Sequence, residues 1–368
     1  MKSRGRKFVW LLFCAFFAGL AYLWYQEHDA GPDEESASIP PLQRVVTTNN
    51  ASPSEQLNVQ LKPGQIFPLM KTVNEKVTQF TPSGPVESQM TLKVLLVIRV
   101  QEVLKDRTKL RVDYQRVQFS QNFPGNQIQY DSDTPPRTIP LEAQVYHGLA
   151  KNGFEFWIGR DHKVIEPVEG FQEFLKRCVQ HVSPEQREAV MTQFVKSTGD
   201  DAIANFIDDS IGLLPNHNRK VQAGDTWTRK RQVLRPVPIY LSSNCTLKKI
   251  DSKIAEIVID GRVIPSAAYG QTPNQKNAIQ LSVVDGHLAG ECRIRRETGL
   301  PEQSKIRRVF DMRVRLPNGH VVRQRKDSTT TITVYEPQGT PKSIATPNAG
   351  ARRADQVSKL SPNDRSVR

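Results

Sequence analysis

The sequence is poor in cysteine, in aromatic residues and in catalytic motifs. Its 368 residues include four cysteines, none spaced as CxxC, and 7% aromatic residues. This cysteine pattern argues against a structural zinc site, and a chain of this length can bury enough surface to fold without metal or disulfide staples. It also lacks GxSxG, HExxH, a phosphate-binding glycine loop and a dinucleotide fingerprint. We therefore expect no cofactor and no metal, and we assign no catalytic residue.

Positive charge is in excess. Lysine and arginine number 51 against 38 aspartate and glutamate residues, which gives a formal net charge of +13. A surplus of this size favours anionic partners such as phospholipid headgroups, acidic wall polymers or nucleic acid. The net charge alone does not choose among them.

The N-terminal region has the pattern of a membrane-inserting segment. Four basic residues between Lys2 and Lys7 come before an uncharged run at residues 8–25, and acidic residues follow it. Because basic residues stay on the cytoplasmic side of such a segment, we expect the rest of the chain outside the cytoplasm. About 18 apolar residues is the shortest length that spans the bilayer core. Residues 1–28 are therefore either an uncleaved membrane anchor or a signal peptide.

Two segments without hydrophobic periodicity flank one folded domain. Residues 29–54 are rich in proline, serine, asparagine and acidic residues, which is typical of a solvated linker. Residues 337–368 are poor in large apolar residues and rich in proline, serine and arginine, which predicts a disordered basic tail. The folded domain is expected at residues 55–336.

Alternating apolar residues predict strands on both sides of a central helical block. Met90–Val103 and Leu110–Phe119 predict two long paired strands, and one slip in the alternation of the second predicts a bulge. Residues 122–140 are rich in turn-forming residues and are expected to be a surface loop. Further strands are predicted between Thr226 and Glu336, separated by turns at Asp260–Gly261, Asp285–Gly286 and Pro317–Gly319.

The apolar period changes to three to four residues in mid-chain. Ser183 is the predicted N-cap of a second helix, and a third apolar stripe runs from Ala202 to Leu214. The first stripe consists of Phe171, Phe174, Leu175, Cys178, Val179 and Val182. A concave sheet is the simplest place to bury three one-sided helices. The sequence thus predicts an α+β fold: a mainly antiparallel curved sheet or open β-barrel, with a helical insert at residues 168–214 packed in its concave face.

The last predicted strands concentrate basic residues on one face. Residues 293–326 contain eleven basic residues and three acidic ones. Arginines alternate there with apolar residues, so we expect them on the solvent face of the sheet. A guanidinium binds phosphate or carboxylate through two parallel hydrogen bonds, which makes this face a candidate docking surface. The alternative is a solvated face whose long arginine stems cover the sheet. The candidate ligand-binding residues are Arg293, Arg295, Arg313, Arg315, Arg323 and Arg325.

Cys245 and Cys292 both lie near the start of a predicted strand, in a domain expected outside the cytoplasm, where thiols oxidise. A disulfide would need their Cα atoms to lie within ~7 Å of each other. Two independently buried cysteines are the alternative.

A short motif carries a family resemblance. Residues 221–227 read VQAGDTW, hairpins follow, and Gly290–Arg293 leads into Glu297–Leu300. The pattern resembles an uncharacterised family of secreted bacterial β-rich envelope domains. The strand order with mid-chain helices is loosely similar to the superfamily of LolA-like and LolB-like lipoprotein carriers. The resemblance implies a curved sheet around a helical plug with a lipid-sized cavity, and it assigns no ligand residue to this chain.

The expected function is therefore non-enzymatic. We expect an envelope protein that binds an apolar or anionic ligand near the membrane, such as lipid, lipoprotein or wall polymer, or that scaffolds an envelope component. Nucleic acid is disfavoured because no stacking aromatic residues are interleaved with the arginines. The alternative is an envelope hydrolase whose site consists of isolated carboxylates, such as Asp161, Glu166, Asp208 and Asp209.

Overall fold

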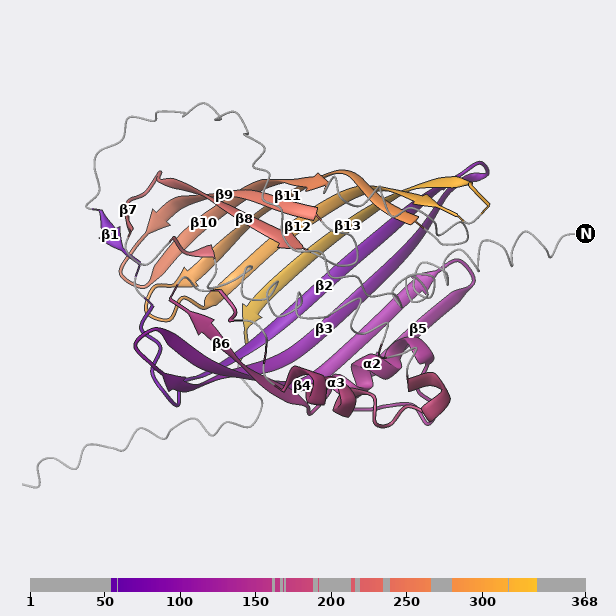
Figure 1. Ribbon diagram of the computed structural model, residues 1–368, viewed down its shortest axis with the longest axis horizontal. Helices are drawn as coiled ribbons and strands as arrows, with labels where there is room; N and C mark the ends of the chain where they lie inside the picture. Colours follow the sequence, from indigo (N-terminus) through magenta and orange to yellow (C-terminus); the bar gives the residue numbers. More distant parts are fainter. Residues whose placement is uncertain are drawn as a thin grey trace, which may run out of the picture. The chain divides into compact units, whose positions relative to one another are not determined.

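The computed structural model describes residues 54–335, except for residues 58, 161–162, 166–167, 169, 188–190, 192–212, 216–218, 234–238, 266–279 and 317. Eleven strands within these residues form one open, curved antiparallel sheet (Figure 1). The predicted anchor, the predicted tail and all but the last residue of the predicted linker lie outside the described residues.

The strands follow the spatial order β5, β4, β3, β2, β13, β12, β11, β10, β9, β8. Because β5 and β6 pair with opposite ends of β4, they share one edge of the sheet, and β8 forms the other. The strands are β2 (Ile66–Thr81), β3 (Gly84–Val103), β4 (Arg107–Phe123), β5 (Asn126–Asp131), β6 (Gly153–Gly159), β8 (Thr226–Val233), β9 (Ile239–Ile250), β10 (Ile254–Pro265), β11 (Gln280–Arg295), β12 (Pro301–Arg315) and β13 (Val321–Val334). A separate two-stranded pair joins β1 (Glu55–Gln56) to β7 (Lys220–Val221).

One face of the sheet, called the inner face below, carries the main hydrophobic core. Buried apolar residues from β2, β3, β4, β6 and β8 to β13 belong to a single cluster on this face. Helices α2 (Leu141–Leu149) and α3 (Phe171–Cys178) lie against it beside β4 and β6 (Figure 1). The Tyr146 ring stacks on Phe119 at 4.7 Å between centroids, and Phe174 stacks on Tyr114 at 6.2 Å. The predicted α+β fold with helices against a curved antiparallel sheet is confirmed.

The first predicted helical stripe is confirmed residue by residue. All six of its apolar side chains are buried, although the helix ends at Cys178 and the next residues form turns. Pro184–Arg187 are helical after Ser183, as the N-cap pattern predicts. Of the third stripe only Leu214 lies within the described residues, and it is buried in the main core next to Leu213.

The bulge predicted in the second long strand is also confirmed. Leu95 pairs with Arg116 and Leu96 pairs with Tyr114, which leaves Gln115 outside the register. An extra residue at this point explains the slip in the apolar alternation of β4.

Three predictions about irregular structure are wrong. Of the predicted loop at residues 122–140, the first part instead forms a hairpin, because β4 continues to Phe123 and pairs with β5 after a turn at residues 124–125. Asp260–Gly261 lies inside β10, and Asp285–Gly286 lies inside β11 beside a register shift. A Cβ on Gly286 would lie 2.6 Å from the carbonyl oxygen of Val309. Glycine at position 286 therefore allows the neighbouring strand to lie close, and it does not mark a turn.

Cys245 and Cys292 are both buried, and neither forms a disulfide. They lie on β9 and β11, with β10 between them. Two strand spacings amount to roughly 10 Å, which exceeds the Cα separation of a disulfide. Independent burial is the correct alternative.

Candidate functional site

The six candidate arginines all lie exposed on the outer face of the sheet, opposite the main core. They alternate with the inward-facing residues Cys292, Ile294, Met312, Val314 and Val322, which are all buried. The predicted alternation of the last strands is therefore present in the structure. It places every candidate arginine where a partner in solution can reach it.

The structure brings four of the six arginines together. Arg313 on β12 lies directly opposite Arg323 on β13, and Arg315 and Arg325 are the next outward residues on those strands. Arg293 pairs instead with Gln303, ten residues along β12 from Arg313. Ten strand residues span roughly 33 Å. The predicted site is thus two separate groups.

The two arginine groups differ in their charge balance. Arg293 lies 3.4 Å from Glu302 and 3.8 Å from Glu256, so its charge is shared with two carboxylates. Among the four clustered arginines, Arg325 lies 3.9 Å from Asp311. Asp285 lies opposite Asp311 on β11. Four guanidinium groups against these two carboxylates leave the cluster net positive.

Exposed apolar side chains on β2 and β13 lie beside the clustered arginines. Phe80 on β2 lies opposite Arg323, whose guanidinium carbon is 5.7 Å from the Phe80 ring centroid. Val321 lies opposite Arg315. We call these residues together the basic–apolar patch: Phe80, Arg313, Arg315, Val321, Arg323 and Arg325. Tyr240, Ile264 and Val284 extend the exposed apolar surface at this end of β9, β10 and β11. Sequence reasoning missed Phe80 because it did not predict β2.

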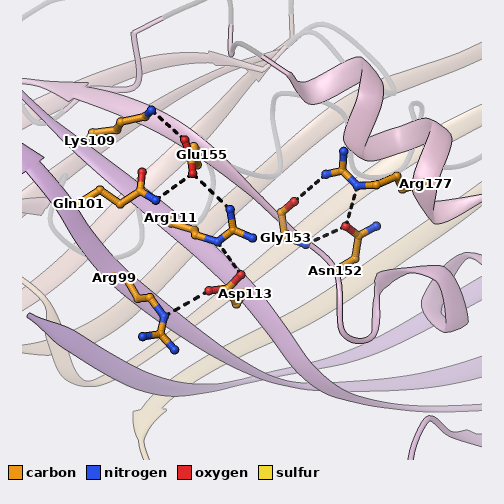
Figure 2. Close-up of polar contacts among 9 residues, drawn as sticks. All are labelled: Arg99, Gln101, Lys109, Arg111, Asp113, Asn152, Gly153, Glu155 and Arg177. Carbon is orange, nitrogen blue, oxygen red and sulfur yellow. Dashed lines mark hydrogen bonds and ion pairs between the residues drawn. The ribbon is translucent and has the colours of Figure 1, made fainter. Parts of the chain in front are cut away.

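A second group of charged side chains joins β3, β4 and β6 (Figure 2). Glu155 on β6 accepts hydrogen bonds from Gln101 at 2.8 Å and Arg111 at 3.2 Å, and Lys109 lies 2.8 Å from its other oxygen. Arg111 also donates to Asp113 at 2.8 Å. The hydrogen bond from Lys109, together with those of Gln101 and Arg111, lowers the pKa of Glu155 from 4.5 to about 2. This network fastens edge strand β6 to the sheet.

Arg177 connects this edge to α3. Its guanidinium donates to the side-chain oxygen of Asn152 at 3.2 Å and to the carbonyl oxygen of Gly153 at 2.9 Å (Figure 2). Asn152 also accepts a hydrogen bond from the Gly153 amide at 2.9 Å. These contacts hold the last turn of α3 beside the start of β6. The charged side chains at this edge already have protein partners, which is typical of polar networks that stabilise a fold.

Glu155→Gln tests the role of this network in stability. A carboxylate whose pKa is lowered by folding stabilises the fold above its unfolded pKa, and that contribution is lost as pH falls from about 4.5 toward 2. Because the side chain is 33% exposed, screening limits the expected loss to about 1 kcal/mol near neutral pH. Urea denaturation across this pH range should show the difference from the parent disappearing in acid.

Glu87→Gln is the matched control for that experiment. Glu87 lies 2.7 Å from Lys76, and both side chains are about half exposed, at 45% and 46%. Such a surface pair contributes less than about 0.5 kcal/mol. An equal loss in the two variants would show that the β6 network adds nothing beyond an ordinary surface ion pair.

The carboxylates proposed for a hydrolase lie outside the described residues. Asp161, Glu166, Asp208 and Asp209 all fall in the gaps. Within the described ranges, no group of three or more histidine, cysteine, aspartate or glutamate side chains could hold a metal ion. No helix in that part of the chain has the length and apolar character needed to cross a membrane.

His147 connects α2 to the neighbouring sheet. It is partly buried, and its Nδ1 atom lies 2.7 Å from the Tyr130 hydroxyl. Burial lowers its pKa. The contact fastens α2 to edge strand β5.

The VQAGDTW motif builds the junction between β7 and β8. Gly224 adopts a φ of +93°, and the Asp225 carboxylate accepts a hydrogen bond from the Gln222 amide at 3.0 Å. The turn brings Trp227 onto the inner face of β8, where its indole N–H donates to the carbonyl oxygen of Leu213 at 3.1 Å. The motif therefore joins the end of the mid-chain segment to one edge of the sheet.

These features define a protein with one open antiparallel sheet, an inner apolar face covered in part by short helices, and a basic outer surface. The sequence matches the family described as "Family of unknown function (DUF6263)" over residues 105–301, more than half of the chain. The chain belongs to this family. No curated protein matches its sequence.

Three solved structures show a general similarity. The first, entitled "Lipid-protein interactions in lipovitellin", matches at 9% identity and a TM-score of 0.42, covering 75% of this chain and 25% of its own. The translocator domain of the autotransporter NalP from Neisseria meningitidis matches at 5% identity and TM-score 0.18, covering 75% and 90%. An outer membrane channel from Pseudomonas putida F1 matches at 6% identity and TM-score 0.18, covering 78% and 100%. The chain thus spans a quarter of the lipovitellin chain, and none of these scores indicates a shared function.

Proposed function

We propose that this chain is a non-enzymatic binding protein of the cell envelope whose basic–apolar patch docks on anionic lipid headgroups. The N-terminal segment would hold it at a membrane, with the domain outside the cytoplasm, as the charge asymmetry around residues 8–25 suggests. A ligand of the kind handled by LolA-like and LolB-like carriers, a lipoprotein or its lipid, is the finer form of this proposal.

The observation that carries the proposal is the pairing of Arg313 with Arg323. Two like charges directly opposite each other on neighbouring strands are mutually unfavourable. An anion between them removes that repulsion, and phosphate accepts two parallel hydrogen bonds from each guanidinium. Exposed Phe80 and Val321 beside the arginines suit the boundary between headgroups and acyl chains.

Binding to vesicles tests the proposal. The full chain, held in nanodiscs of zwitterionic lipid, is mixed with anionic or zwitterionic vesicles and separated by flotation. We expect it to bind the anionic vesicles at low salt and to dissociate as the salt is raised toward about 1 M, where the Debye length falls to about 3 Å. Binding that ignores lipid charge or salt would refute anionic docking.

Arg313→Gln/Arg323→Gln should weaken vesicle binding about thirtyfold, because each basic residue near an anionic surface contributes about 1 kcal/mol. The matched control is Arg293→Gln/Arg295→Gln, which removes two arginines from the same face at the other end of the strands. The two arginine groups lie roughly 33 Å apart along the strands, which exceeds the Debye length of about 8 Å. The control should therefore change binding less than about twofold. Equal losses would show that only net charge matters.

A further inference from the structure

Two histidines that lie far apart in the sequence meet beside edge strand β5. His147 lies in the last turn of α2, and His181 lies in the turns that follow α3. The centres of their rings are 4.7 Å apart, and the ring planes make an angle of 73°. Burial lowers the pKa of both side chains, and the charge of His147 lowers that of His181 further. Both imidazoles are therefore neutral at neutral pH, which is the form that binds a metal ion.

Each imidazole uses one ring nitrogen to contact the protein. The Nδ1 atom of His147 lies 2.7 Å from the Tyr130 hydroxyl on β5. His181 forms a hydrogen bond with the backbone of Gln144, which lies one turn before His147 on α2. Histidines that bind metal ions nearly always donate their other ring N–H to a protein oxygen, because this contact fixes the tautomer and the orientation of the ring. Within the described part of the chain, the second nitrogen of each ring has no hydrogen-bond partner.

The separation of the two rings suits one shared metal ion. The bond between a metal ion and an imidazole nitrogen is about 2.0–2.1 Å long, so two rings on one ion have centres about 4.5–5.2 Å apart for ligand angles between a right angle and the tetrahedral angle. The separation of 4.7 Å lies in this range. His181 is exposed, so an ion can reach the pair from solution.

Gln144 supplies a third candidate ligand. Its side-chain oxygen is buried and accepts no hydrogen bond from any described residue. Because Gln144 lies three residues before His147, the two side chains share one face of α2. Buried polar atoms normally have a partner, and an amide oxygen with free lone pairs can bind a cation.

The ligand set indicates the class of metal. Neutral imidazole suits divalent transition metals such as Zn²⁺, Ni²⁺ and Cu²⁺, whereas Mg²⁺ and Ca²⁺ prefer oxygen ligands alone. No third histidine, cysteine, aspartate or glutamate joins the pair within the described ranges. The amide oxygen and water must therefore complete the coordination.

We propose that His147 and His181, together with the side-chain oxygen of Gln144 and water, bind a divalent transition metal ion such as Zn²⁺. The ion joins the last turn of α2 to the segment after α3. Tyr130 extends this connection to β5, so the metal fastens the helical cover to the edge of the sheet. The site shares no residue with the basic–apolar patch and does not depend on it.

Zinc titration tests the site in the full chain, prepared without a histidine tag and held in nanodiscs of zwitterionic lipid. Calorimetry at neutral pH is expected to show binding of Zn²⁺ and none of Mg²⁺. Modification with diethyl pyrocarbonate, read by mass spectrometry, then locates the ion. We expect Zn²⁺ to protect His147 and His181 and to leave the exposed His287 and His320 reactive. Absence of Zn²⁺ binding, or protection of other histidines only, would overturn the proposal.

Two variants make the test specific. Tyr130→Phe keeps all three ligands and removes the hydroxyl that positions His147, and loss of such an outer contact typically weakens metal affinity about 10–100-fold. His181→Gln removes one ligand at an exposed position, so it should fold like the parent and lose at least as much affinity. Parental Zn²⁺ affinity in His181→Gln would show that the ion binds elsewhere.

The matched control is His320→Gln, which removes an exposed histidine between β12 and β13. It should bind Zn²⁺ like the parent. Urea denaturation gives an independent readout, because Zn²⁺ at 100 times its Kd should lower the unfolding equilibrium constant of the parent and of the control by up to about 100-fold. His181→Gln should show little of this stabilisation. An equal response to Zn²⁺ in the parent and in His181→Gln would assign the contact of the two rings to packing alone.

Discussion

Gly148→Ala is expected to destabilise the fold by about 3 kcal/mol, although alanine favours a helix. A Cβ on Gly148 in α2 would overlap the backbone carbonyl of Cys178 at the end of α3, and a backbone group cannot rotate away as a side chain can. The two helices must therefore separate. Overpacking of this kind typically costs about 1–3 kcal/mol, and backbone against backbone belongs at the upper end. Urea denaturation of the variant and the parent measures the loss.

Glu142→Ala in the first turn of the same helix is the control for Gly148→Ala. Its side chain is only partly buried, and alanine is the better helix former, so stability should change by less than about 0.5 kcal/mol. If Gly148→Ala matched this control, the close approach of α2 and α3 would be absent from the protein. The inner face would then lack its helical cover beside β4.

Trp227→Ala is expected to cost about 3–5 kcal/mol, the usual range for removing a buried large aromatic side chain. Trp227 is 7% exposed and packs in the main core on edge strand β8. Trp227→Phe retains a ring but leaves the carbonyl oxygen of Leu213 without its donor, which should cost about 1–3 kcal/mol. Denaturation gives the loss, and hydrogen exchange should show β8 opening first.

Trp157→Phe is the matched control for Trp227→Phe. Trp157 is only partly buried on the outer side of β6, where Arg107 lies 4.5 Å above its ring. A phenyl ring keeps part of that cation–π contact, so the loss should stay below about 1 kcal/mol. Equal losses of stability at the two positions would contradict a stabilising hydrogen bond between the Trp227 indole and the Leu213 carbonyl oxygen.

Strict periodicity is what made parts of this fold predictable. Phe171, Phe174 and Leu175 repeat at the helical period and are buried on α3, and Met312 and Val314 alternate with arginines on β12. In each case one face of the element meets the core and the other meets water. The sequence pattern then reports the geometry directly.

The elements that the sequence did not predict, β2 and α2, lack this contrast between an apolar face and a polar face. Strand β2 carries Lys71, Glu75 and Gln79 on its inner face, so its apolar residues do not alternate. These polar inward-facing residues are thus the reason that β2 escaped prediction. Helix α2 is short and buries only Ala143, Val145 and Leu149. Its position depends on contacts with β4 that lie far away in sequence.

The sequence predicted the chemistry of the candidate site, but it did not predict which residues lie together there. Alternation placed all six arginines on the solvent face, but the register of β12 with β13 decides which ones are neighbours. Register follows from pairing along the whole strand and cannot be read from one segment. For the same reason, Phe80 joins Arg323 only through the pairing of β2 with β13.

The most direct test of membrane docking is the depth of single labelled positions in anionic bilayers. In a full chain with Cys14→Ser, a bimane label on Val321→Cys reports on the basic–apolar patch, and one on Leu104→Cys reports on the opposite end of the sheet. Both native side chains are exposed, at 46% and 39%. In vesicles of brominated anionic lipid, quenching at position 321 but not at position 104 is expected. Equal quenching, or quenching at position 104 alone, would contradict docking through the patch.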